Sequence, residues 1–538
     1  MQSNVKSCSK IYPEEFMIGI VNHSDEEGFT FISKERLPAG MFACYLEEEK
    51  KILCRVKIAE PLKQYPQEFL MDMELSPDDV CTFYGFDPQD FKYYSYSASV
   101  VGYFDNAMGE FINPRTNPAP GVKIHRAGED ILKDISKVKP GESGSAFIGN
   151  VLGEKTGIAL SVRDIVSQHV SVIASTGAGK SYTVGVLVEE LLRPYNMAPV
   201  LIFDPHGEYS SLGEISNTTE FATASYRPRV RIVKPKDIKI RINDLNVGDF
   251  ISIMDDGTMS DKMKMLFRSA YHGLKNDKKK QFTRNELRLR IESLRDQNND
   301  STIDGINWRF GKLNAPIFDD FQTIPLADYF KIGQLTIMDV SGIEETFQQL
   351  IASVMLRRLF DAREGTENNR YYEMHIDKFL PYPVFVVIEE AHRFAPQSGE
   401  AKSKSILKTI LSEGRKFGIG VCLVSQRPSK LDADSLSQCM TQITMRIINP
   451  TDQQQIAQSI ESASRELISE LPSLAKGQAI ISGVAINTPA LVKIRRRLTS
   501  DTKGRSKDAP ALWAAQRKYE DKLRVPEVKA DEEMDIGV

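Results

Sequence analysis

The sequence of 538 residues has no long hydrophobic run and no surplus of charge of one sign. No apolar stretch approaches the roughly 18 residues of a membrane-spanning helix, so we expect no contact with a membrane. The first ten residues, MQSNVKSCSK, lack the apolar core of a signal peptide. We therefore expect a cytoplasmic location. The net charge of −4 excludes a strongly cationic domain, so any nucleic-acid contact must come from local basic surface.

Cysteine and histidine are also scarce. The six cysteines show no CxxC spacing, and the seven histidines do not cluster with them. We therefore expect neither a zinc site nor a structural disulfide. With 41% hydrophobic and 26% charged residues, the chain has the composition of a globular protein of roughly two to four domains.

A glycine-rich turn is the most informative feature that is present. Residues 174–181 read ASTGAGKS, with a β-branched run at residues 170–173 before them and apolar residues at helical spacing after them. Glycines allow backbone N–H groups at the start of a helix to surround a polyphosphate. The segment therefore predicts a phosphate-binding loop and a nucleotide hydrolase. Alanine at the first position, where glycine is usual, is a mild departure.

The residues of this loop have distinct expected roles. Lys180 would reach the β- and γ-phosphates of ATP, and the hydroxyl of Ser181 would hold Mg²⁺. We expect the nucleotide to be bound by Ser175, Thr176, Gly177, Ala178, Gly179, Lys180, Ser181 and Tyr182.

The hydrophobic pattern divides the chain into parts. Short apolar runs between polar turns predict a small β-barrel domain over residues 1–150, with strands at residues 16–21, 29–32, 42–46 and 52–58. Alternating strands and helices predict an α/β core over residues 151–500, of the RecA-like P-loop ATPase class. A charge-rich helical insertion interrupts the core at about residues 243–325, with helices near residues 262–274 and 282–294. Residues 501–538 form a C-terminal arm.

Four hydrophobic strands in the core each finish in a polar residue. They are residues 200–203 before Asp204, 335–338 before Asp339, 384–388 before Glu389, and 421–424 before Ser425 and Gln426. A mainly parallel sheet produces this pattern, because its active site lies at the carboxyl ends of the strands.

Two adjacent glutamates follow the third of these strands. An acid at this position organises Mg²⁺, and the next one polarises the attacking water as general base. We assign Glu389 to the metal and Glu390 to the water. The unbroken apolar run before them argues against a surface pair of glutamates. Glutamate stands where aspartate is more usual, which adds a methylene between the strand and the metal.

Five segments resemble, in order and wording, the HerA family of hexameric DNA translocases in the HerA/FtsK group. They are the phosphate loop, FDPHGEY at residues 203–209, IEEAHRFAP at 388–396, EGRKFG at 413–418 and SQRPS at 425–429. The resemblance extends over roughly residues 15–500, since family members also begin with a small β-barrel.

The resemblance implies two further catalytic residues. Gln426 matches the glutamine that senses the γ-phosphate, and Arg415 matches the arginine finger offered to the ATP of the neighbouring subunit. A planar guanidinium suits this role because it stabilises the charge spread over a transferring phosphoryl group. Asp204, His206 and Glu208 also match a family segment, and their roles stay open.

Two surface segments have alternative interpretations. Residues 397–404 (QSGEAKSK) are small, polar and basic, as suits a loop that tracks a DNA backbone, and a solvated loop is an equal alternative. The basic stretch that begins at residue 494 is either a solvated arm or a brace on a neighbouring subunit.

The leading functional prediction is an ATP-driven homohexameric helicase or translocase that threads double-stranded DNA. By resemblance to the archaeal branch, its partner would be a NurA-type nuclease in the resection of double-strand breaks. One alternative is a HerA-type ring in a bacterial anti-phage complex, with a sirtuin-like or nuclease effector. Another is a regulatory ATPase without motor activity. A secretion or conjugation motor is disfavoured, because no membrane anchor is present.

Overall fold

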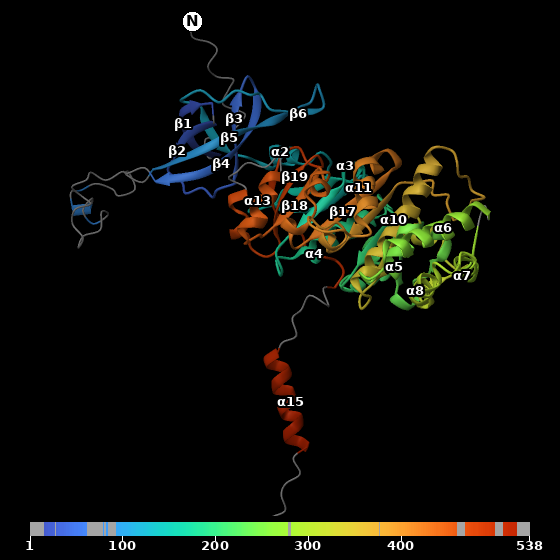
Figure 1. Cartoon of the computed structure of the whole chain (residues 1–538). Helices are drawn as coiled ribbons and strands as arrows, with labels where there is room; N and C mark the ends of the chain where they lie inside the picture. The colour runs from blue at the N-terminus through green and yellow to red at the C-terminus, as the bar shows by residue number, and fades with distance from the viewer. Residues whose placement is uncertain are drawn as a thin grey trace, which may run out of the picture.

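The computed structural model describes residues 16–26, 28–61, 79, 82–83, 85, 93–277, 281–375, 377–459, 468–500 and 509–523. The N-terminal ten residues, two of the cysteines (Cys8 and Cys81) and much of the expected C-terminal arm lie outside this part of the chain. Within it, a β-barrel, a large α/β unit and a group of helices are arranged as Figure 1 shows. No helix in the described part is both long and apolar enough to cross a bilayer.

The N-terminal strands close into a six-stranded barrel. Its strands are β1 Met17–Asp25, β2 Gly28–Ser33, β3 Phe42–Glu47, β4 Lys50–Pro61, β5 Tyr94–Asp105 and β7 Lys123–Arg126, and β6 Glu110–Ile112 extends β5 as a hairpin. They pair antiparallel in the order β2-β1-β7-β3-β4-β5, and β5 returns to β2. Aromatic side chains fill the interior, where the rings of Phe31 and Tyr96 stack at 5.4 Å. The barrel prediction is confirmed, and all four expected strands belong to it.

The next strand after the barrel belongs to a different sheet. The chain leaves β7 through α2 Glu129–Leu132 and the 3₁₀ helix η5 Lys133–Ile135, and β8 begins at Ser145. Residue 150, the boundary expected from the sequence, therefore lies inside β8. We propose a boundary between residues 127 and 144 instead.

The α/β unit is built on an eleven-stranded sheet. In sheet order the strands are β12 Arg229–Val233, β15 Gln334–Asp339, β11 Val200–Asp204, β16 Val384–Ile388, β17 Ile419–Ser425, β10 Val170–Ile173, β18 Thr441–Met445, β19 Gln478–Gly483, β20 Ala490–Ile494, β8 Ser145–Val151 and β9 Gly157–Ser161. The first seven run parallel, and the last four add antiparallel pairs. The sheet is therefore mainly parallel, as predicted.

Both faces of this sheet are covered, which is why its strands are apolar throughout. Along β11, Leu201 and Phe203 join one apolar cluster while Val200 and Ile202 join the other. The helix α4 Lys180–Leu191 packs against the second face, and α10 Glu345–Glu367 and α11 Lys404–Glu413 pack against the first.

Several shorter helices complete the unit. The α-helices are α3 Val162–Gln168, α9 Leu326–Tyr329, α12 Ala433–Ser437 and α13 Pro450–Ser459, and α15 Ala509–Leu523 follows near the C-terminus. The 3₁₀ helices are η6 Ser210–Asn217, η7 Thr219–Phe221, η8 Pro235–Asp237, η9 Ile242–Asp244, η10 Gly311–Asn314, η11 Ala391–Arg393, η12 Gly414–Phe417, η13 Pro428–Lys430 and η14 Leu471–Ser473.

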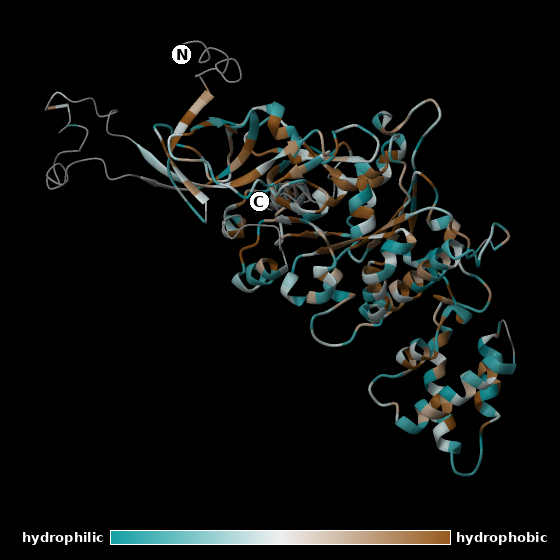
Figure 2. Ribbon diagram, turned by 90° about the horizontal axis from the view of Figure 1, so that it is seen from above, coloured by the Kyte–Doolittle hydropathy of each residue, from teal (hydrophilic) through white to brown (hydrophobic). Residues whose placement is uncertain are grey.

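The predicted helical insertion is confirmed. It contains α5 Val247–Met254, α6 Asp261–Asp277, α7 Arg284–Glu292 and α8 Asp300–Phe310. The chain enters and leaves it through the short parallel pair β13 Ile240–Arg241 and β14 Phe318–Asp319. Capping boxes at Asn246 and Thr283 start α5 and α7. In Figure 2 these helices stand to one side of the sheet. Their buried residues, such as Phe250, Phe267 and Leu287, belong to the same apolar cluster as Leu201.

Candidate nucleotide-binding site

The phosphate loop joins the central strand β10 to α4. Gly177 and Gly179 adopt positive φ angles of 80° and 111°, which side chains with a Cβ rarely tolerate. The loop is tied internally by the Ala178 N–H, which donates to the carbonyl of Ser175 at 3.1 Å. The start of α4 at Lys180 then directs free N–H groups toward the space above the loop, as a phosphate site requires.

Strand register brings the predicted acids to this loop. β10 lies beside β17, which lies beside β16, so Ile173, Ser425 and Ile388 end at the same edge of the sheet. Glu389 directly follows β16 and is fully buried. Glu390 has φ of 52°, an unusual value for a residue with a side chain, and the chain turns sharply there into η11.

A buried ion pair joins the lysine to both glutamates. Lys180 Nζ lies 2.5 Å from Glu389 Oε1 and 3.0 Å from Glu390 Oε1. Burial would lower the pKa of Lys180, but the two carboxylates outweigh it and raise that pKa. These contacts use two of the three N–H groups of the lysine, so a nucleotide that binds Lys180 would compete with the two carboxylates for it.

The two glutamates differ in their acidity. Burial raises the pKa of Glu389 to about 7, against the opposing attraction of Lys180. Burial also acts on Glu390, but Lys180, His392 and Gln426 outweigh it and lower the pKa of that carboxyl. Glu390 is therefore the carboxylate that stays ionised at neutral pH, which a general base requires.

Gln426 connects the loop to Glu390. Thr176 Oγ1 donates to Gln426 Oε1 at 2.6 Å, and Gln426 Nε2 donates to Glu390 Oε1 at 2.6 Å. His392 lies on the other side of the same carboxylate, with Nδ1 3.3 Å from Glu390 Oε2. The amide side chain thus touches both the loop that would surround phosphate and the expected base.

The segment after β11 supplies groups whose roles the sequence left open. Asp204 is buried and accepts backbone N–H bonds from His206, Glu208 and Tyr209, which fixes the turn. Glu208 Oε2 accepts a hydrogen bond from Ser181 Oγ at 2.5 Å. The Tyr209 hydroxyl donates to Glu389 Oε2 at 3.2 Å. His206 is exposed.

These oxygens fit a magnesium ion. Ser181 offers a hydroxyl, and Glu208 and Glu389 offer carboxylates, which are the hard donors that Mg²⁺ prefers. Among the described residues, no group of three or more His, Cys, Asp and Glu is placed to hold a metal. Glu208 is the donor that sequence reasoning did not assign.

A cavity of about 230 Å³ opens above the loop. It is lined by Ser175, Thr176, Gly177, Gly179, Lys180, Ser181, Tyr182, Glu208, Gln426, Lys476 and Arg497. The predicted loop residues line it, except Ala178, which is buried beneath. Lys476 and Arg497 come from the C-terminal part of the core and were not predicted.

Arg415 lies away from this cavity. It is an exposed residue of η12, which precedes β17, whereas the phosphate loop faces the opposite end of that strand. The seven residues of β17 span about 23 Å. Arg415 instead lines a hollow with Arg163, Asp164 and Gln168 around α3. The structure therefore does not bring Arg415 to Lys180 of its own chain.

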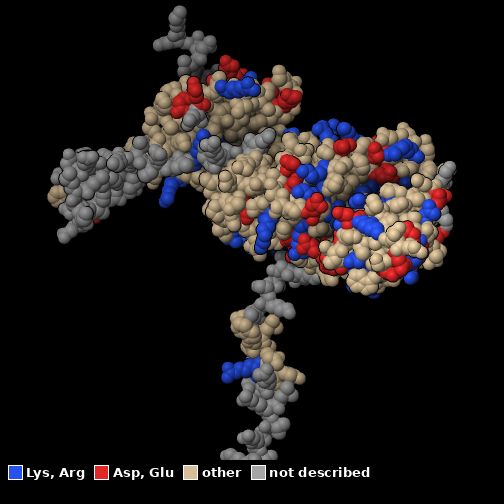
Figure 3. All heavy atoms as spheres, viewed as in Figure 1, with Lys and Arg blue, Asp and Glu red and all other residues tan. Residues whose placement is uncertain are grey.

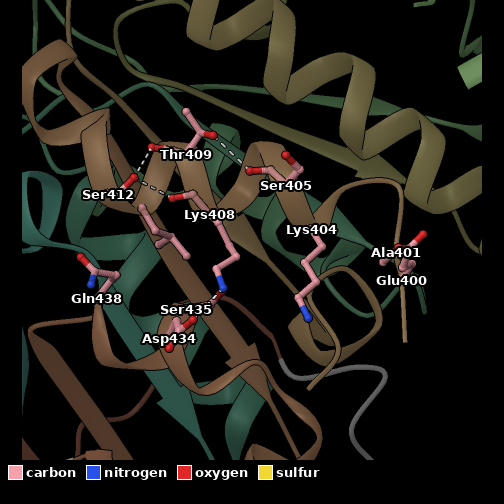
Figure 4. A pocket seen from close by; sticks show the side chains of 11 residues that line it. Glu400, Ala401, Lys404, Ser405, Lys408, Thr409, Ser412, Asp434, Ser435 and Gln438 are labelled. Atoms are coloured by element: carbon pink, nitrogen blue, oxygen red, sulfur yellow. Dashed lines mark hydrogen bonds and ion pairs between the residues drawn. The ribbon is translucent and has the colours of Figure 1, made fainter. Parts of the chain in front are cut away.

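The expected DNA loop adjoins a larger groove between α11 and α12, of about 720 Å³ (Figure 4). Residues 397–400 are exposed, and Lys404 and Lys408 nearby are paired with protein groups. Lys404 Nζ donates to the carbonyl of Pro396 at 2.7 Å and lies 3.2 Å from Asp432, and Lys408 lies 2.8 Å from Asp434. Charges of both signs are likewise interspersed over the face that Figure 3 shows. The groove favours neither the DNA-tracking nor the solvated interpretation.

Several known proteins are similar to this chain. A family model described as "Helicase HerA, central domain" matches residues 146–359. A probable helicase of Methanocaldococcus jannaschii, MJ1565, is 32% identical over 405 residues, which cover 72% of this chain and 73% of that protein. The DNA double-strand break repair helicase HerA of Pyrococcus furiosus is 29% identical, over 72% of this chain and 75% of that protein. The solved structure of VirB4 of Thermoanaerobacter pseudethanolicus aligns with a TM-score of 0.46 and 13% identity, over 66% of this chain and 98% of that one.

Proposed function

The chain belongs to the HerA helicase family, and we propose that it is an ATP-driven translocase that moves along double-stranded DNA as a homohexameric ring. We propose further that it works with a NurA-type nuclease in the resection of DNA ends. The relative from Pyrococcus furiosus, named as a double-strand break repair helicase, supports the repair role.

One observation carries the proposal: a phosphate loop whose lysine is buried against two strand-end glutamates. This arrangement can divide the work of ATP hydrolysis. Lys180 would leave the carboxylates and contact the β- and γ-phosphates. Glu390, whose pKa is held low, would then accept the proton of the attacking water.

The neighbouring groups support the same chemistry. Gln426 bonds to Glu390 and to Thr176 through the two ends of one amide. A change at the phosphate that moves Thr176 would therefore also change the hydrogen bond to Glu390. Mg²⁺, which we propose as the cofactor, would be held by Ser181, Glu208 and Glu389 and would neutralise charge on the phosphate oxygens.

The position of Arg415 supports a ring. A finger arginine must approach the γ-phosphate, and Arg415 is exposed at the sheet edge opposite its own loop. In a ring built of identical subunits, that edge of one subunit can face the nucleotide of the next. We therefore propose that the active site is completed only between subunits.

Steady-state ATP hydrolysis by the full chain, with and without duplex DNA, tests the proposal. We expect DNA of unrelated sequences to stimulate hydrolysis similarly, because a ring needs only to track phosphates. Stimulation should fall steeply as salt rises, since phosphate contacts release counterions. The variant Lys180→Ala controls for contaminating ATPases.

Hydrolysis that DNA does not change would favour a regulatory ATPase over a motor. A strong preference for one DNA sequence at fixed salt would contradict the proposed translocase as well. Recruitment of the nuclease is tested separately, by co-purification with the full chain.

A further inference from the structure

The segment that follows β20 is held against the helix of the phosphate loop. Arg495 Nη1 lies 3.0 Å from Glu189 Oε2, and Arg495 Nη2 lies 2.8 Å from Glu190 Oε1. The Thr499 N–H donates to Glu189 Oε1 at 2.9 Å. Glu189 is fully buried, so these contacts fix residues 495–499 along α4.

Arg497 stands at the centre of this segment and reaches the nucleotide cavity. Its backbone N–H donates to the Tyr182 hydroxyl at 2.6 Å, and its guanidinium lies 5.8 Å from the centre of the Tyr182 ring. Nη2 donates to Thr499 Oγ1 at 2.7 Å and to Ser211 Oγ at 3.4 Å, and Nε donates to Thr499 Oγ1 at 3.1 Å. Protein oxygens thus hold Nε and Nη2 and fix the plane of the guanidinium at the cavity wall.

A glycine in α4 makes room for this guanidinium. A Cβ at Gly185 would lie 2.8 Å from both Cζ and Nε of Arg497, closer than real contacts allow. Glycine in a helix interior is destabilising relative to alanine, so its presence here needs a local reason. Gly185 stands one turn after Ser181 on the same side of the helix. The surface of α4 is therefore shaped to seat Arg497 beside the phosphate loop.

The cavity has two chemically different ends. Thr176 and Gln426 adjoin Glu390, so the reacting γ-phosphate belongs at that end. In a phosphate loop the backbone N–H groups surround the α- and β-phosphates and the lysine reaches toward the γ-phosphate. The α-phosphate and the ribose then belong at the other end. We assign Tyr182 and Arg497 to that end, because they line the same cavity and contact each other beyond Ser181.

We propose that Arg497 binds the α-phosphate and ribose end of the nucleotide, so that the C-terminal segment of each chain completes its own nucleotide site. The proposal rests on the proposed ATPase function. Arg497 differs from Arg415 in two respects: it acts within its own chain, and it contacts a part that ATP and ADP share. It is therefore a nucleotide-binding residue that does not depend on assembly.

Equilibrium binding of fluorescent ADP and of fluorescent ATP to the full chain tests this inference. The measurements use the Glu390→Gln background, so that ATP is not consumed. We expect Arg497→Ala to weaken both nucleotides by the same factor, about tenfold or more, as befits a lost hydrogen bond to a charged group. The adjacent exposed Arg496 provides the matched control, and Arg496→Ala should bind both nucleotides as the parent does.

The variant Gly185→Ala distinguishes a lost nucleotide contact from a loss of binding that is caused by unfolding. Alanine favours the helix, yet its Cβ should displace the guanidinium and weaken both nucleotides in the same direction. Unchanged binding by Gly185→Ala and Arg497→Ala would overturn the inference, as would a much larger loss for ATP than for ADP, which would assign Arg497 to the γ-phosphate. Failure of the parent chain to bind either nucleotide would instead overturn the proposed function itself.

Discussion

At the scale of single residues, Lys180 and Glu390 belong to one buried ion pair, yet variants of the two should lose ATP hydrolysis for different reasons. Lys180→Ala removes a charge that contacts ATP in the ground state, so binding and turnover should both fall. Glu390→Gln should bind ATP nearly as the unaltered chain does but hydrolyse it about a hundredfold to ten-thousandfold more slowly. Nucleotide binding and steady-state hydrolysis measured on both variants check this. Equal loss of ATP binding in the two would contradict the assignment.

Glu389 should make the stability of the nucleotide-free protein depend on pH. Its pKa is raised from an ordinary 4.5 to about 7, so the folded state holds the proton more tightly than the unfolded state. That contribution is fully present below pH 4.5 and is lost as the pH rises through 7, by up to about 3 kcal/mol. Unfolding of the unaltered chain and of Glu389→Gln, compared from pH 5 to pH 8, should show the unaltered chain losing stability relative to the variant as the pH rises.

Glu390 provides the matched control for this titration. Its pKa is lowered, so its contribution is present above 4.5 and is lost only as the pH falls through the lower, folded value. The stability difference between the unaltered chain and Glu390→Gln should therefore stay constant from pH 5 to pH 8. If the curve for Glu389→Gln also runs parallel to that of the unaltered chain, Glu389 does not hold its proton in this range.

At the scale of elements, α11 and η12 carry Arg415 to the edge of the sheet opposite its own phosphate loop. Arg415→Ala should lower hydrolysis on the order of a thousandfold. Mixing these inactive subunits with inactive Glu390→Gln subunits should restore some activity, since certain interfaces then pair an intact base with an intact finger. The adjacent exposed Lys416 gives the control variant, Lys416→Ala, which should stay active. If mixed rings of verified composition show no activity above either parent, Arg415 acts within its own chain or has a structural role.

Elements also show how far the sequence alone could lead. Strand-end acids such as Glu389 could be predicted, because a buried parallel strand leaves a continuous apolar run followed by a polar residue. Glu208 could not, since its contact with Ser181 depends on the turn that Asp204 fixes. Arg497 could not be predicted either, because it lies more than 300 positions from the phosphate loop that it adjoins.

The contacts of the basic stretch from residue 494 could not be predicted from the sequence either. We read it as a solvated arm or as a brace on a neighbouring subunit. In the described part, up to residue 500, Arg495 pairs instead with Glu189 and Glu190 of its own α4. Arg496 beside it is exposed, and the brace on a neighbouring subunit stays a prediction. A run of basic letters does not reveal the buried carboxylates that neutralise it. The later residues of the stretch lie outside the described part, up to α15.

At the scale of the whole molecule, a truncation should remove the barrel without loss of ATP binding only if it keeps the whole of β8. A chain that begins at residue 150 lacks most of β8, which pairs with both β9 and β20. It should lose stability and ATP binding. A chain that begins at residue 128 keeps the complete sheet and should still bind ATP, because the barrel supplies no phosphate-binding residue. Thermal unfolding and nucleotide binding of the two chains check this.

The shorter chain also tests what the barrel is for. We expect the chain that begins at residue 128 to bind ATP but not to recruit the nuclease, since a barrel on one face of a ring can hold a protein that caps the pore. Co-purification of the nuclease with this chain would show that the docking surface lies elsewhere. Equal instability of both truncations would show that the barrel and the ATPase unit stabilise each other. Phe42 and Leu53 of the barrel would account for this, because they join the apolar cluster under the sheet.

The ion pair of Lys180 also bears on the end of each catalytic cycle. In the proposed ATPase cycle, the carboxylates of Glu389 and Glu390 would release Lys180 to a bound nucleotide and would pair with it again when the products leave. ADP would therefore compete with two protein carboxylates for Lys180, whereas in a pocket without those carboxylates it would compete only with water. Release of ADP would then be an exchange of partners at Lys180, which should shorten the time that ADP stays bound. The same exchange should lower the affinity for ATP, so faster release of ADP would be accompanied by weaker binding of ATP.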